Sequence, residues 1–159
     1  MPNSSHTQIE VDGIPGYYRY PTIYQNTVVF TAEGDLWKVC RKGGLAQRLT
    51  THPGSESHAA ISPDGRTLAF SAQYEGPTEV YTMPLQGGLP TRMTYEGEEA
   101  WVVGWTPDGK ILYSTKHYST LPNTQLATID PATKTHCVFP LSQANDGVFT
   151  PDGETLFFT

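Results

Sequence analysis

The chain has 159 residues, of which 10 are lysine or arginine and 16 are aspartate or glutamate, for a formal net charge of −6. This length is enough for one domain with a substantial core. No cluster of basic residues is present that could neutralise a run of phosphates, so we do not expect nucleic acid as a partner. The apolar runs are far shorter than the roughly 18 to 20 residues of a membrane-spanning helix, so we expect no membrane partner either.

The first 15 residues form a polar N-terminal extension. This extension lacks the positively charged start and the apolar centre of a secretory signal, which predicts a cytoplasmic location unless a leader has been removed.

The central feature of the sequence is a turn that returns at a constant interval. The motif reads SPDG at 62–65, TPDG at 106–109 and TPDG at 150–153, and its prolines are 44 residues apart each time. Proline pre-sets the backbone angle of the second turn position, aspartate bonds to the backbone two residues on, and glycine accepts the positive φ that follows. Each motif therefore predicts a tight link between two antiparallel strands.

The segments around these turns indicate an all-β chain. In the second unit we expect strands at 58–62, 67–72, 79–83 and 91–95, and no stretch of the chain has the apolar spacing of a long helix. The first unit has YQNT at 24–27 in place of the turn, but GDLWKVCRKGG at 34–44 matches TEVYTMPLQGG at 78–88. Four antiparallel strands per roughly 44 residues are typical of a β-propeller blade, whereas a β-sandwich has no cause to repeat one turn at a constant interval.

The repeat predicts the boundaries of the blades. We place them at about 17–52, 53–95 and 96–140, with a half-blade at 141–159, so that residues 16–159 form a partial propeller. Because a propeller normally closes with four to eight blades, about three and a half blades are an incomplete ring. We therefore expect the chain to be part of a longer protein, or several copies to complete one another.

Aromatic residues recur at matching positions of the units. Trp37 and Tyr81 share one position, and Phe30, Phe70 and Tyr113 lie near the strand that follows the turn. Because the facing surfaces of neighbouring blades must both be covered, we expect these rings to fill the wedge between blades as core residues.

The polar residues do not assemble a metal site. Asp64, Asp108 and Asp152 are 44 residues apart, whereas calcium loops gather their ligands within about a dozen residues, so we interpret these aspartates as turn residues and expect no metal. Cys40 and Cys137 lack cysteine partners at metal-ligand spacing, and we expect them to be free and buried.

The sequence also resembles a known family. The stretches GYYRYPTIYQNTVVFTAEGDLWKV at 16–39 and GGLAQRLTTHPGSESHAAISPDGRTLAFSAQYEGPTEVYTMPLQGG at 43–88 closely resemble the N-terminal propeller of tricorn-type proteases. The match is continuous to about residue 115. The shorter motifs SPDG, LAFS and TEVYTMP are also similar to the WD40-like repeats of TolB and of prolyl-oligopeptidase relatives.

The resemblance implies a role for the parent protein. It implies a serine peptidase with further propeller, PDZ and peptidase domains, a cytoplasmic homo-oligomer that trims peptides and whose propellers filter them. The catalytic residues belong to the peptidase domain, so we expect no catalytic residue and no cofactor in this segment. A basic pair thought to anchor peptide carboxylates in some members has no counterpart in the acidic YEGEEAW at 95–101. The alternative function is a TolB-like scaffold for protein–protein binding.

Three residues are candidates for lining a central channel. His58 lies near the start of the predicted innermost strand of its blade, and Arg19 and Asp146 lie at corresponding places. Polar side chains on a wet tunnel would suit the passage of peptides, although simple solvation of the wall is the alternative interpretation.

Overall fold

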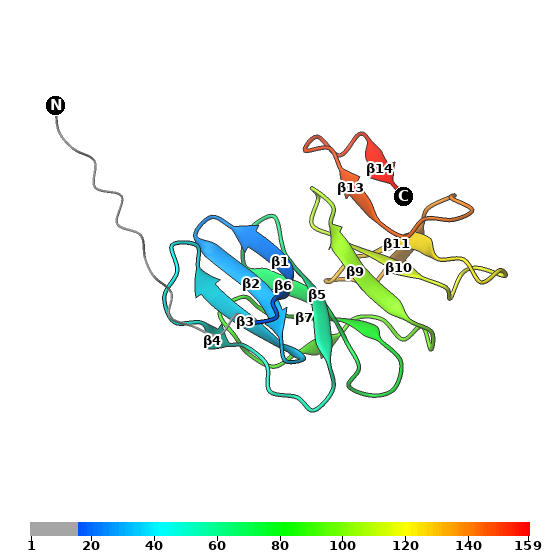
Figure 1. Ribbon diagram of the computed structural model, residues 1–159. Coiled ribbons are helices and arrows are strands. Elements are labelled where there is room, and N and C mark those ends of the chain that lie inside the picture. Colours follow the sequence, from blue (N-terminus) through cyan, green and yellow to red (C-terminus); the bar gives the residue numbers. More distant parts are fainter. Residues whose placement is uncertain (1–15) are drawn as a thin grey trace.

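The computed structural model describes residues 16–159, so the predicted polar extension at 1–15 lies outside the described residues. The described chain forms three four-stranded antiparallel sheets and one two-stranded sheet (Figure 1). The first sheet contains β1 (Arg19–Tyr24), β2 (Thr27–Ala32), β3 (Asp35–Cys40) and β4 (Gln47–Arg48), and the second contains β5 (Glu56–Ile61), β6 (Thr67–Ala72), β7 (Glu79–Pro84) and β8 (Thr91–Arg92). The third sheet contains β9 (Ala100–Trp105), β10 (Ile111–Thr115), β11 (Gln125–Ile129) and β12 (His136–Val138). The last hairpin contains β13 (Gly147–Phe149) and β14 (Leu156–Phe158).

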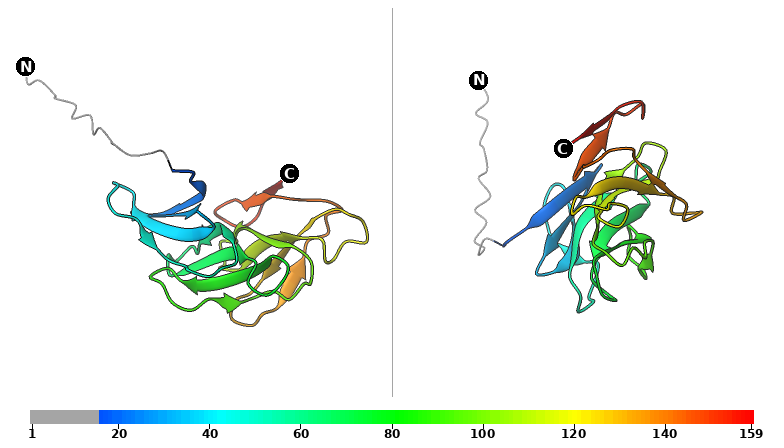
Figure 2. Two further views of the ribbon diagram at one scale, coloured as in Figure 1. Left: turned by 60° about the horizontal axis from the view of Figure 1, so that its bottom comes forward. Right: turned by 90° about the vertical axis from the view of Figure 1, so that its right-hand side faces the viewer.

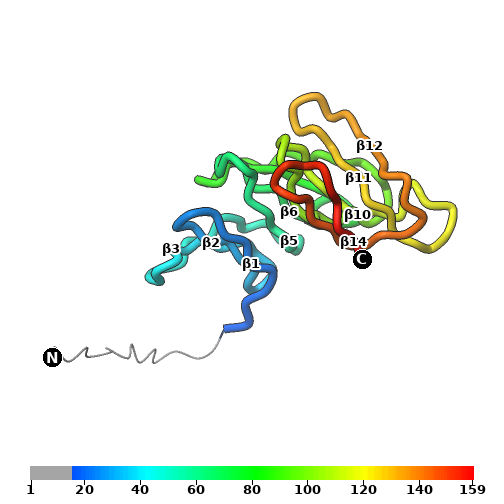
Figure 3. The backbone as a smooth tube through the Cα atoms, turned by 90° about the horizontal axis from the view of Figure 1, so that it is seen from above, coloured from blue at the N-terminus to red at the C-terminus, as the bar shows by residue number. Residues whose placement is uncertain are grey.

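The sheets follow one another face to face along an arc. Strands pair in chain order within each four-stranded sheet, and the first strand of the second sheet, β5, contacts both β1 and β9. The first sheet lies on one side of the molecule, and the third sheet with the last hairpin lies on the other (Figures 2 and 3). The predicted all-β propeller with an incomplete ring is confirmed. Within residues 16–159 no helix is long and apolar enough to cross a membrane.

The repeated turns are built as the sequence predicts. In the first of them the Asp64 carboxylate accepts a hydrogen bond from the Ser62 hydroxyl at 2.6 Å and another from the backbone N–H of Arg66 at 3.0 Å. Gly65 has a φ of +71°, in the region that favours glycine. Asp108 and Asp152 accept from the threonine hydroxyls of their own turns in the same way. The prediction that these aspartates are turn residues is confirmed.

The core is divided into clusters between consecutive sheets. Val29 and Leu36 of the first sheet pack against Phe70 and Tyr81 of the second. Residues from the other face of the second sheet, including Val80, pack against the third sheet. The aromatic wedge is confirmed for Phe70, Tyr81 and Tyr113, which are 0%, 5% and 0% exposed.

Some strands end earlier than predicted, because a side chain takes the place of a backbone hydrogen-bond partner. β6 has the predicted bounds, but β8 ends at Arg92 and not at residue 95. The Val80 N–H donates to the Thr94 hydroxyl at 2.9 Å, and this side-chain acceptor ends the regular pairing.

The burial of the two cysteines was predicted wrongly. Cys40 and Cys137 are free thiols, but both are exposed. The physical reason is their place in the sheets. Cys40 is the last residue of β3, and Cys137 belongs to β12, the outermost strand of the third sheet.

Candidate functional site

The first strands of the sheets run together along the inner side of the arc. β1, β5 and β9 contact one another in order, and β13 contacts β9. Each of the first three has an irregular register against its neighbour: β1 between Arg19 and Thr22, β5 between Ser57 and Ala60, and β9 opposite the step from Leu112 to Tyr113. Bulges of this kind bend a strand and turn a side chain in a new direction. They define an inner wall with irregular backbone at matching places.

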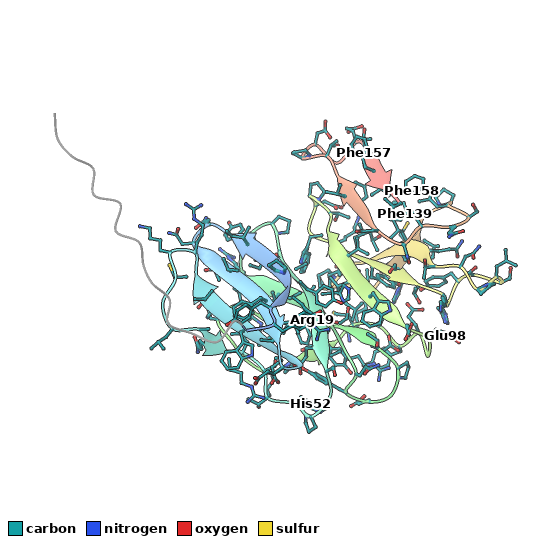
Figure 4. The ribbon with its side chains drawn as sticks, in the orientation of Figure 1. Arg19, His52, Glu98, Phe139, Phe157 and Phe158 are labelled. Carbon is teal, nitrogen blue, oxygen red and sulfur yellow. The ribbon has the colours of Figure 1, made fainter. Side chains whose placement is uncertain are left out.

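The three residues predicted to line a channel lie on this inner wall. Arg19 begins β1 and is exposed, and Figure 4 shows it beside β1 and β5 near the middle of the arc. His58 lies inside β5 with a φ of 51°, and its Nδ1 is 2.9 Å from the Ser57 hydroxyl. Asp146 directly precedes β13, and its carboxylate accepts a hydrogen bond from the Gly147 N–H at 2.8 Å.

The electrostatics of His58 link the three side chains. Burial is the largest influence and holds the pKa of His58 below its ordinary value. The positive charge of Arg19 lowers the same pKa, whereas the negative charge of Asp146 raises it. The structure therefore brings Arg19 and Asp146 within electrostatic reach of the His58 imidazole, which is neutral at neutral pH.

The sequence analysis did not identify two aromatic residues of this wall, Tyr20 and Trp101. The Tyr20 ring lies 3.9 Å from the His58 ring, and the Trp101 ring lies 5.0 Å from it on the other side, measured between centroids. Tyr20 is the structural counterpart of His58, because Arg19 pairs with Thr31 as Ser57 pairs with Ser71. Aligning the first unit by its strands, in place of its missing turn, would have revealed Tyr20.

Buried acids elsewhere are held inside the sheets. Glu79 is 1% exposed and forms an ion pair with Arg92 at 2.9 Å. Glu56 is also 1% exposed and accepts hydrogen bonds from the hydroxyls of Thr50 and Tyr74, at 2.9 and 2.7 Å. These acids join strands and loops, so we assign them a structural role.

One acid of the segment at 95–101, Glu96, is bound by side chains of the third sheet and its loops. Glu96 is buried and accepts hydrogen bonds from the hydroxyls of Tyr113 and Tyr118, at 2.9 and 3.2 Å, and His117 and His136 lie beside it. Within residues 16–159, no group of three or more histidine, cysteine, aspartate or glutamate residues is arranged to hold a metal ion. Exposed Glu98 lies at the rim, away from Arg19 (Figure 4).

Comparison with known proteins agrees with this architecture. Residues 15–159 match the family described as the tricorn protease N-terminal beta propeller domain. Tricorn protease homolog 1 of Streptomyces coelicolor is 38% identical over 92 residues, which cover 57% of this chain and 9% of that protein. The match thus spans less than a tenth of that curated relative.

Solved structures show the same fold. The crystal structure of the tricorn protease superposes with a TM-score of 0.76 at 24% identity, covering 88% of this chain and 15% of that chain. A TolB candidate from Agrobacterium tumefaciens superposes with a TM-score of 0.80 at 22% identity, covering 91% of this chain and 54% of that one. Since the family match extends over nearly the whole chain, this protein belongs to the family of tricorn protease N-terminal beta propeller domains.

Proposed function

We propose that this chain is the non-catalytic propeller segment of a tricorn-like serine protease and controls the access of peptides to the peptidase domain. The family match over residues 15–159 is the observation that carries the proposal. The inner wall supports it, because Arg19, His58 and Asp146 offer charged and neutral polar groups along the concave side of the sheets.

The partners follow from the same proposal. The free face of the first sheet has a pocket of about 980 Å³ lined in part by Tyr18, Phe30 and Trp37. At the other end, Val148, Phe157 and Phe158 are 64%, 63% and 49% exposed. Apolar faces of this kind favour packing against further propeller and peptidase domains of a cytoplasmic homo-oligomer. Peptides are the proposed substrates of that assembly.

The test is a deletion in the complete protein that contains this chain. Removing the propeller should raise the trimming of long or folded substrates relative to short peptides, because a filter excludes large substrates. Hydrolysis of a small chromogenic amide and the size of the assembly serve as controls for an intact peptidase. Identical trimming of short and long substrates before and after deletion would contradict the proposal.

The alternative is a TolB-like scaffold for protein binding, favoured by the superposition on the TolB candidate. The two functions predict different complete proteins. A reading frame that continues from Thr159 into more blades and a peptidase domain supports the protease segment, whereas closing blades without a peptidase domain support the scaffold.

A further inference from the structure

The inner wall carries a row of aromatic rings, one from each of three successive sheets. Tyr20 of β1 lies against His58 of β5 with ring centroids 3.9 Å apart and planes at 30°. His58 meets Trp101 of β9 edge-on, at 5.0 Å and 62°. We call these three rings the aromatic belt. The edge-on geometry of His58 and Trp101 is among those that aromatic pairs prefer, whereas Tyr20 and His58 are in closer, tilted contact.

The backbone beneath the belt is strained at matching positions. Tyr20 and His58 have φ values of 49° and 51°, in the left-handed region that bulky side chains rarely adopt. Both lie within the register irregularities of β1 and β5. Strained bulges redirect side chains and cluster at ligand sites, so the repeated outlier indicates that the direction of these rings matters for binding.

The rings of the aromatic belt stay partly accessible to a ligand. Tyr20 is 39% exposed, and His58 and Trp101 are half-buried. The indole N–H groups of Trp37 and Trp105 donate to backbone carbonyls at 3.2 and 2.9 Å. By contrast, the indole of Trp101 makes no hydrogen bond with any residue of the described part of the chain. One belt member therefore offers a donor to a ligand.

The charges around the belt select against a cationic ligand. The Arg19 guanidinium already lies over the rings of Tyr17 and Tyr20, 5.3 and 5.6 Å from their centroids. A second cation would be repelled by Arg19 and would compete with it for the same ring faces. Burial and Arg19 keep the pKa of His58 low, so the middle ring is uncharged at neutral pH. Arg19 and the opposing Asp146 are the charged groups that act on it.

We propose that the aromatic belt binds an uncharged aromatic side chain of an extended peptide on the inner wall, with the Trp101 N–H donating to a peptide carbonyl. The proposal rests on peptide access being the function of the chain. It adds a substrate preference, because ring stacking distinguishes phenylalanine, tyrosine and tryptophan from aliphatic and cationic side chains.

The experiment measures peptide binding to the complete protein by fluorescence anisotropy. The probes are labelled glycine–serine peptides that differ only in one central residue: phenylalanine, leucine or lysine. We expect the phenylalanine peptide to bind severalfold more tightly than the leucine peptide, and Trp101→Ala to lose about tenfold of that binding. Trp101→Phe keeps an aromatic ring but lacks the N–H donor, so it should restore only part of this binding. Tyr95→Phe, at an exposed ring beside Arg92 of the outer strand β8, should change nothing, and thermal unfolding verifies that every variant is folded.

The outcomes separate this inference from the proposed function. Equal binding of the phenylalanine and leucine peptides, unaffected by Trp101→Ala, would overturn the belt while leaving peptide access in place. Tightest binding of the lysine peptide would also overturn it. If none of the peptides binds, the belt is again refuted, and the propeller deletion decides separately whether the chain controls access.

Discussion

The first and second sheets carry the same residues at matching positions but bury them differently. Phe70 and Tyr81 in the second sheet are 0% and 5% exposed, whereas their counterparts Phe30 and Trp37 in the first are half-buried. The second sheet is covered on both faces, by the first and the third, while within residues 16–159 the first sheet packs against a neighbouring sheet on one face. The repeat therefore specifies which face is apolar, and the neighbouring sheet determines how much stability that face contributes.

The strongest test of this comparison is truncation of the paired phenylalanines. Phe70→Ala should destabilise the chain by about 3 to 5 kcal/mol, because it opens a cavity between two sheets. Phe30→Ala should cost clearly less, since Phe30 is partly exposed and its surroundings can collapse. The free energy of unfolding, from urea denaturation, measures both. Equal losses would contradict the idea that the neighbouring sheet sets the difference.

The ion pairs of the two sheets give a second, smaller contrast. Arg92 pairs with Glu79, and the two side chains are 17% and 1% exposed, whereas Arg48, which pairs with Asp35, is 46% exposed. Arg92→Met leaves a buried carboxylate without its cation and should cost about 3 kcal/mol. Arg48→Met should cost less, about 1 kcal/mol, because solvent already screens the exposed Arg48 guanidinium, although Asp35 itself is only 6% exposed. Urea denaturation of both variants tests this order, and a larger loss for Arg48→Met would refute it.

The repeat was predictable from the sequence because it is local. The PDG turns depend on three consecutive residues, and the wedge positions of Phe70 and Tyr113 follow from the alternation along strands. The sequence analysis missed the aromatic belt, because bulges align Tyr20 with His58 and no residue pattern marks these bulges, although a strand-based alignment of the first unit would have pointed to Tyr20. The first unit also lacks the turn that anchors the alignment.

The buried acids escaped the sequence analysis for a different reason. Glu56 draws Thr50 from before β5 and Tyr74 from the loop after β6, so its environment depends on how the loops fold back. Glu96 gathers Tyr113, Tyr118 and two histidines from three separate segments. Spacing along the chain says little about such contacts, which arise only once the sheets have stacked.

A further test concerns Glu56, which also distinguishes the sheets, because the matching positions hold Tyr18, just before β1, and Ala100 of β9. Burial raises the pKa of Glu56 to about 7, and the nearby Asp35 raises it as well, against hydrogen bonds from Tyr74 and Thr50 and the charge of Arg48. Since the folded protein holds this proton more tightly than the unfolded chain, the contribution of Glu56 to stability falls as the pH rises from about 4.5 to 7.

Glu56→Gln should therefore gain stability relative to the parent chain across this window, and the gain should level off above pH 7. Urea denaturation at a series of pH values measures it, with Phe30→Ala as a control variant that keeps Glu56 and every charge named as acting on it. A difference between Glu56→Gln and the parent that stays constant with pH would show that the carboxyl group is no harder to ionise in the folded protein than in the unfolded chain.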